Sequence, residues 1–290
     1  MKSARSSRVF SRRPAGPSRR TFTSVGVVLV AGAALGALAS GCGSDDSTTG
    51  QRLSHATTIA AGDELAAGFV NARGWSIRLQ QARVAVGALY YFDGAPLTAQ
   101  RSPRLFDAVS RWFIREAHAH PGHYQQGNAL GEMTASTSVD LVAGPVDLGT
   151  SSAVTGSYRS ASFDFGARPS GPLADEMGAF VVVVEGTAEK DGMVRMFRAR
   201  ATAADVDDGH GEPVVAGCVF EEKDVQQNGT VTVRVLPSVW LDQVDFEEVP
   251  ESLDGHPVEL DGRGTPHRAF TRGLKKGTGY EFSYVAMEEG

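Results

Sequence analysis

An alternation of apolar and polar side chains recurs after residue 57 and restricts the fold of the chain more than any other feature. It is clear in Trp75–Leu79 and Ala82–Val86, and again in Ser157–Phe165. Side chains with a period of two lie on opposite faces of a β-strand, so each segment predicts a strand. Ala179–Val184 is apolar throughout and predicts a strand that is buried on both faces.

Turn residues separate these segments and predict how some of them are joined. Asp191-Gly192 predicts a hairpin that joins Ala179–Val184 to the strand that follows it. Asn228-Gly229 predicts a second hairpin, between Val215–Phe220 and Val231–Val235. Many short strands divided by turns are typical of two architectures. We therefore predict a mostly β fold, an antiparallel sandwich or barrel.

One segment has a helical period instead. Its apolar residues recur at spacings of three and four: Leu105, Phe106, Val109, Trp112 and Phe113. Pro103 suits the first turn of a helix, so we predict one short helix near 103–115. No internal repeat and no linker rich in Pro and Gly interrupts 57–290, which predicts a single β-rich domain over these residues.

The first 41 residues have the composition of an export signal. They hold seven of the 28 basic side chains and none of the 34 acidic ones. Ser18-Arg19-Arg20-Thr21-Phe22 resembles the twin-arginine export motif, and Ala39-Ser40-Gly41-Cys42 resembles a lipobox. The similarity to bacterial lipoproteins exported by the twin-arginine route implies that residues 1–41 are removed. Cys42 would then carry the lipid.

The apolar run before the lipobox is too short for a membrane-spanning helix, which needs about 20 residues. An uncleaved anchor and a cleaved signal without lipid are the alternatives. The resemblance implies a lipid-anchored protein of the cell envelope, and Gly43 after Cys42 favours the outer membrane over the inner one. Residues 42–56 are polar and rich in turn formers at their start, which predicts a flexible tether.

The charge of the mature chain excludes one class of partner. Beyond residue 41 there are 21 basic residues against 34 acidic ones, a net charge of −13. Nucleic-acid binding requires a basic surface, so we expect no such partner. We expect contact with a membrane through the N-terminal lipid, and no motif indicates a protein partner.

Three of the seven histidines lie within six positions, in the sequence His118-Ala119-His120-Pro121-Gly122-His123. On a strand, His118 and His120 would share one face, about 7 Å apart. Pro121-Gly122 permits a turn that brings His123 toward this pair. Three neutral imidazoles suit Cu²⁺ or Zn²⁺, so we predict a site for copper or zinc. Surface-loop histidines without metal, or a hydrogen-bonded structural cluster, are the alternatives.

Other residues are candidates for the remaining ligand positions. Glu132 follows the histidine cluster and could supply an oxygen ligand, and His210 lies in an acidic loop that would attract a cation. Cys218 lies in an apolar segment and is predicted to be a buried small side chain. No catalytic motif is present, so we expect no enzyme. A metal-bound water at an open ligand position is the alternative that would give catalysis.

Trp75, together with Ala82–Gly94 (ARVAVGALYYFDG), resembles the opening β-segment of the MbnP-like periplasmic copper-binding proteins. This resemblance implies an exported β-protein that holds copper in a histidine-containing site. With the histidine cluster, it leads us to expect a lipid-anchored binding protein that captures copper or zinc through His118, His120 and His123. The alternative is an envelope lipoprotein that acts as a structural or interaction module without metal.

Overall fold

The structure is a computed structural model that describes residues 50–96 and 127–287, which belong to one compact unit, Asp46–Gly290. The predicted signal peptide, Cys42 and the helix predicted near 103–115 lie outside the described residues. Within the described ranges, no helix has the length and apolar character needed to cross a membrane.

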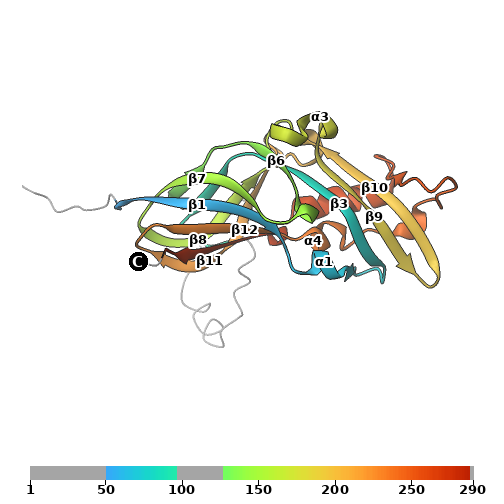
Figure 1. The fold of residues 1–290 in the computed structure, drawn as a ribbon, viewed down its shortest axis with the longest axis horizontal. Helices are drawn as coiled ribbons and strands as arrows, with labels where there is room; N and C mark the ends of the chain where they lie inside the picture. The colour runs from blue at the N-terminus through green and yellow to red at the C-terminus, as the bar shows by residue number, and fades with distance from the viewer. Residues whose placement is uncertain (1–49, 97–126, 288–290) are drawn as a thin grey trace, which may run out of the picture. The chain divides into compact units, whose positions relative to one another are not determined.

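The prediction of a mostly β fold is confirmed, and of the two predicted architectures the chain contains a barrel (Figure 1). Eight strands close it in the order β1-β12-β14-β11-β8-β4-β5-β7. They are β1 (Arg52–Ala61), β4 (Leu89–Phe92), β5 (Ala129–Met133), β7 (Val146–Val154), β8 (Gly156–Asp164), β11 (Val214–Val225), β12 (Gly229–Val235) and β14 (Tyr280–Ala286). The barrel is not purely antiparallel, because β1 pairs with β12 and β11 with β14 in parallel.

A second sheet of six strands has the order β13-β10-β9-β3-β2, with β6 paired to β3. Its strands are β2 (Phe69–Val70), β3 (Ser76–Val86), β6 (Thr137–Asp140), β9 (Phe180–Lys190), β10 (Met193–Thr202) and β13 (Val258–Glu259). The α-helices are α1 (Glu64–Ala67), α3 (Ala174–Met177), α4 (Pro237–Leu241) and α5 (Thr265–Leu274). Five 3₁₀ turns are also described: η1 (Leu141–Ala143), η2 (Gly171–Leu173), η3 (Ala203–Asp205), η4 (Phe246–Glu248) and η5 (Gly277–Gly279).

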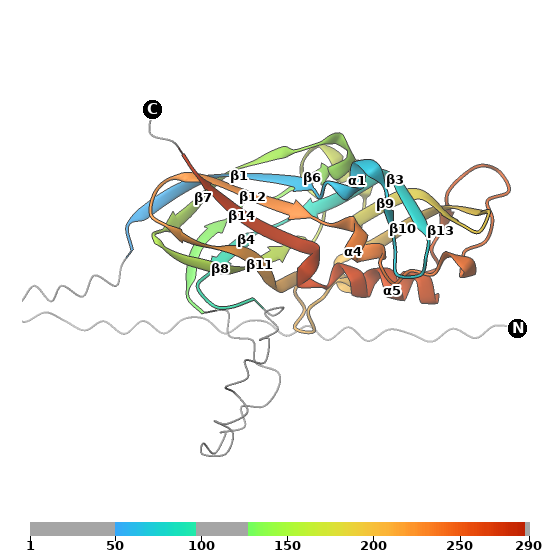
Figure 2. The same cartoon turned by 90° about the horizontal axis from the view of Figure 1, so that it is seen from below.

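Helices α4 and α5 lie beside the second sheet (Figure 2). Aromatic side chains fill the space between these helices and the sheet. The ring of Phe246 contacts those of Trp75 and Phe197, with centroids 5.8 and 4.6 Å apart. All three side chains are fully buried, as is Trp240 of α4. The other face of the sheet carries the polar residues of β3, β9 and β10.

One of the two predicted hairpins is confirmed and the other is wrong. β9 and β10 pair across Asp191 and Gly192, both of which have positive φ (50° and 79°), as this type of turn requires. β11 and β12 do not pair, because β14 lies between them. Gly229 is the first residue of β12, and a Cβ there would meet the Val285 carbonyl of β14, so this glycine permits a close approach of two strands.

The strand directions define two ends of the barrel. We name the end at which β1 begins the proximal end and the end at which β1 ends the distal end. The pairing then places the end of β4, the start of β5 and the β11–β12 turn at the proximal end. β1 begins at Arg52, and from Leu53 and His55 onward its alternate side chains point into the barrel. Arg52–Ala56, which we predicted to be part of the tether, is therefore strand.

Candidate functional site

The connection between β4 and β5 carries the predicted metal ligands, and hydrogen bonds join its two ends. The Asp93 carboxylate accepts hydrogen bonds from the backbone N–H of Asn128 (2.7 Å) and from its Nδ2 (2.9 Å). The Asp93 backbone N–H donates to the Asn128 carbonyl at 3.2 Å. The connection therefore leaves and returns at one point of the proximal end. His118, His120 and His123 lie along it, outside the described residues.

His55 lies inside the barrel, in the half of β1 that belongs to the proximal end. Its side chain is fully buried, and its ring makes edge contacts with Tyr158 and Tyr284, with centroids 6.4 and 5.2 Å away. Neither ring nitrogen has a hydrogen-bond partner among the described residues. Burial lowers the pKa of His55, because a low-dielectric interior disfavours the imidazolium. The ring is therefore neutral, with one donor and one acceptor nitrogen.

Hydroxyl groups from three strands lie in the same interior. In the described part of the chain, Thr57 Oγ1 and Tyr91 Oη have no well-aligned hydrogen-bond partner. Burial raises the pKa of Tyr91, and the neighbouring hydroxyls of Thr57 and Ser151 act in the opposite direction. Ser151 pairs with His55 in the ladder and donates through Oγ to the His55 carbonyl at 3.3 Å. Among the described residues, this interior therefore offers neutral donors and acceptors and no charged side chain.

Two tyrosines beside His55 hold the proximal end together. The Tyr158 hydroxyl donates a hydrogen bond shared between the carbonyls of Leu130 (3.1 Å) and Val154 (2.8 Å), which joins β5 to the end of β7. The Tyr284 hydroxyl donates to the carbonyls of the β11–β12 turn at Gln227 (2.9 Å) and Asn228 (3.3 Å). Burial raises the pKa of both phenols, so they stay protonated and serve as donors.

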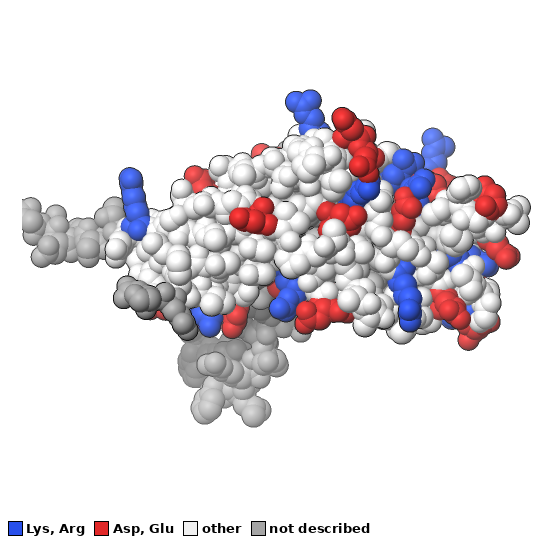
Figure 3. Space-filling view, in the orientation of Figure 1, with Lys and Arg blue, Asp and Glu red and all other residues white. Residues whose placement is uncertain are grey.

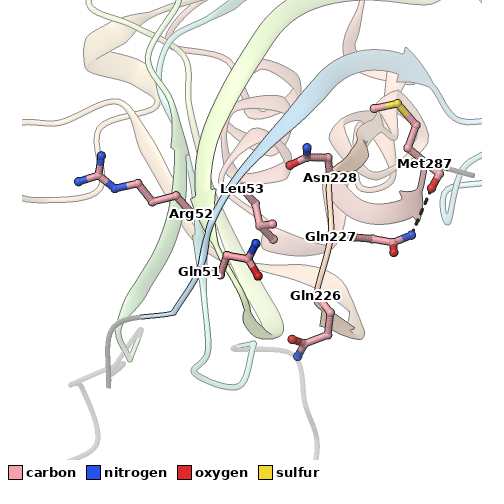
Figure 4. A pocket seen from close by; sticks show the side chains of 7 residues that line it. All are labelled: Gln51, Arg52, Leu53, Gln226, Gln227, Asn228 and Met287. Carbon is pink, nitrogen blue, oxygen red and sulfur yellow. Dashed lines mark hydrogen bonds between the residues drawn. The ribbon is translucent and has the colours of Figure 1, made fainter. Parts of the chain in front are cut away.

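Two surface cavities flank Leu53 at the proximal end. One has a volume of about 540 Å³ and lies between the start of β1, the β11–β12 turn and Met287 (Figure 4). The other, of about 450 Å³, lies against β4, β5 and β7 and has Tyr90 and Glu132 in its wall. The mouths of β-barrels are common places for ligand sites.

The structure separates the two additional candidate ligands. Glu132 is exposed on β5, close to the connection that carries the histidines. His210 is exposed in the loop before β11, at the distal end. The Asp207 carboxylate of that loop accepts hydrogen bonds from the backbone of Gly211 (3.0 Å) and Gly209, which lower its pKa. The carboxylate of Asp207 is thus used to accept hydrogen bonds from the backbone of its own loop.

Cys218 is a buried, free side chain in β11, as predicted. Desolvation raises the pKa of its thiol to about 12, so a thiolate is not available to a metal at neutral pH. Across residues 50–96 and 127–287, no group of three or more His, Cys, Asp and Glu side chains is placed to hold a metal ion.

Sequence reasoning gave His55 no role because it is isolated from the other histidines. The alternation of Leu53, His55, Thr57 and Ile59 is the signal that could have found it, since this pattern predicts an inward-facing imidazole. His267 is also buried, and its Nε2 lies 2.9 Å from the Arg200 carbonyl. Because it has this partner, His267 has a structural role in α5.

Comparison with known proteins gives one structural neighbour. No protein-family model matches the chain, and no curated protein matches it. Among solved structures, the chain is similar to MbnP from Methylosinus trichosporium, with a TM-score of 0.38 and 12% sequence identity. The match covers 81% of this chain and 99% of that one. MbnP is also the name of the family that Ala82–Gly94 resembles.

Proposed function

We propose that this chain is an exported, lipid-anchored binding protein that captures copper or zinc through His118, His120 and His123. The observation that carries the proposal is the spacing of these histidines in a connection with joined ends. Neutral imidazole nitrogens are good ligands for both metals, and three of them suffice for a tight site. The proposed role is capture without turnover, since no general base accompanies the cluster.

The hydrogen bonds between Asp93 and Asn128 support this proposal. His123 is five residues from Asn128, so the chain keeps it within about 18 Å of this anchor. A loop with joined ends loses less conformational entropy on binding a metal than a free segment would. Glu132 follows the same anchor and is the additional donor that we retain. His210 is at the distal end, and we do not include it.

The proposed lipid anchor fits the position of β1. Arg19 and Arg20 would direct export, and acylated Cys42 would hold the chain to the envelope membrane. The eight residues from Cys42 to Gly50 span at most about 28 Å. The proximal end, with the attachment points of the histidine connection, would then lie near the membrane surface.

Metal titration of the mature chain tests the proposal. The chain is produced from Cys42 with Cys42→Ser, freed of metal, and titrated with Cu²⁺ and with Zn²⁺. We expect one equivalent to bind tightly, and this binding to be lost when His118, His120 and His123 are all replaced by Ala. The matched control replaces two exposed histidines elsewhere, His210→Ala and His256→Ala, and should bind as the parent does.

Two results would refute the proposal. One is the absence of stoichiometric binding of either metal, and the other is unchanged binding in the triple variant. The first would favour the alternative, an envelope lipoprotein that acts as a structural or interaction module without metal; the second would assign the metal to other residues. Elemental analysis of protein folded in the cell then identifies which of the two metals is bound there.

A further inference from the structure

The polar face of the second sheet brings arginines from two strands into one groove. β9 lies between β3 and β10, and Arg83 and Arg200 both pair with Val183 across it. Arg198 pairs with Glu185 in the next position on the same face, because side chains two residues apart point the same way. On the face drawn in Figure 3, charged side chains of both signs gather over this sheet.

The groove has a volume of about 510 Å³, which is within the range of small-molecule sites. Phe180 is the main apolar side chain that faces it, since Met177 and Val183 are buried, and its polar lining includes the three arginines together with Glu176 and Glu185. The Arg200 guanidinium lies over the Phe180 ring, with Cζ 4.2 Å from the centroid. One guanidinium of the groove therefore lies directly against an aromatic ring.

Carboxylates orient two of the guanidinium groups through Nε alone. Arg198 Nε donates to Glu185 at 2.5 Å, and Arg200 Nε donates to Glu259 at 2.9 Å. In the described part of the chain, the two terminal nitrogens of each arginine have no hydrogen-bond partner. The side chains of Arg198 and Arg200 are 38% and 35% exposed, so these nitrogens can reach a ligand. Glu185 and Glu259 thus orient the two guanidinium groups and leave their terminal nitrogens open to a ligand.

The third arginine, Arg83, already binds a carboxylate at the edge of the groove. Arg83 Nη2 lies 2.6 Å from the Glu176 carboxylate, and Glu176 is 56% exposed on the four-residue helix α3. A guanidinium fork binds the two oxygens of a carboxylate or a phosphate in a bidentate manner. The chain beyond residue 41 has a net charge of −13 and therefore repels anions overall. An anion would bind only where arginines are clustered, as they are in this groove.

We propose that this groove binds an organic oxyanion, a carboxylate or phosphate attached to an apolar group. The oxyanion lies on the free nitrogens of Arg198 and Arg200, and the apolar group packs against the half-buried Phe180. The site is on the second sheet and is independent of the metal site that we propose on the barrel.

Binding of three related probes to the metal-free mature chain tests this site. The probes are 2-naphthoate, 2-naphthyl phosphate and the uncharged 2-naphthamide, followed by calorimetry or by their own fluorescence. We expect saturable binding of one equivalent of at least one anion, and much weaker binding of the amide. The better of the two anions identifies the headgroup.

Matched arginine variants assign the binding to the groove. Arg198→Gln/Arg200→Gln should lower the affinity for the anion by about tenfold or more, because each guanidinium loses a hydrogen bond to a charged group. Arg159→Gln/Arg234→Gln removes two exposed arginines of the barrel, which also face carboxylates (3.8 and 3.7 Å), and should leave binding unchanged. If the first double variant fails to fold, Arg200→Lys keeps the charge, loses the fork and should still bind more weakly.

Three results would overturn the proposal. They are no saturable binding of either anion, equal binding of the amide, and equal loss in the two double variants. The last would show that overall charge, rather than the two forks, attracts the anion.

Discussion

Acidification should destabilise the folded chain through His55, whose ring lies among aromatic side chains with no acceptor for an added proton. Burial lowers its folded pKa below the ordinary value of 6.5. Below that value the unfolded chain binds a proton at this position and the folded chain does not. The free energy of unfolding therefore decreases as the pH falls from 6.5 toward the folded pKa.

The size of the effect follows from a single proton. Between the two pKa values, the free energy of unfolding decreases by about 1.4 kcal/mol for each pH unit. For a domain of this size, that change lowers Tm by about 3–5 °C. Backbone hydrogen bonds lower the pKa of Asp207 and Asp254, but these carboxylates lose their contribution only below their ordinary value of 3.8. Between about pH 5 and 6.5, the change in the free energy of unfolding therefore reports on His55 and not on these two carboxylates.

Urea unfolding of the metal-free mature chain from about pH 5 to pH 8, followed by tryptophan fluorescence, measures this dependence. His55→Leu removes the titrating group and both unpartnered nitrogens. Because an unpaired buried polar group costs about 1–3 kcal/mol, this variant should be at least as stable as the parent above pH 7. His210→Gln removes an exposed histidine as the control. Parallel curves for the parent and His55→Leu below pH 6.5 would refute the reasoning.

Three further predictions follow from other parts of the structure. Cys218 is fully buried with a thiol pKa of about 12, so it should react with thiol reagents only after denaturation; rapid labelling of the folded chain would contradict this. A Cβ on Gly273 would lie 2.2 Å from a backbone oxygen of α4, so Gly273→Ala should cost about 1–3 kcal/mol in urea unfolding, whereas Gly262→Ala, in open space, should cost far less. Asp93→Ala removes the anchor of the β4–β5 connection and should weaken copper binding, whereas Asp147→Ala, which removes a carboxylate that accepts a bond from Gly149 of its own strand (2.8 Å), should not; equal affinities would show that the anchor does not serve the metal site.

Local sequence patterns predicted β3 and β8 to β12, but not β1, β5, β7 or β14 of the barrel. Val181–Val184 is buried throughout, and Asp191-Gly192 forms the turn that its residue types favour. Cys218 is buried, as its apolar neighbours indicated. These features depend on residues close in sequence, where side-chain period and turn chemistry act directly.

These local patterns did not predict which strands are neighbours in the barrel. Asn228-Gly229 has the sequence of a hairpin turn, yet β12 pairs with β1 and β14 instead of β11. The Asn228 side chain accepts a hydrogen bond from the Ser54 backbone at 2.9 Å, a partner 174 residues away. A turn sets the direction of the next strand, but the neighbour of that strand depends on packing over the whole barrel.

By itself, the sequence determined the β character of the chain, the positions of six of the strands described (β3 and β8 to β12), and a histidine spacing suited to a transition metal. Only the tertiary structure decided that His55 faces a closed interior without partners, and that Arg198 and Arg200 share a groove with Phe180. Periodicity and turn residues act between neighbours in the chain. Barrel closure and strand order join residues that are far apart in it, and these long-range pairings place the side chains of both sites.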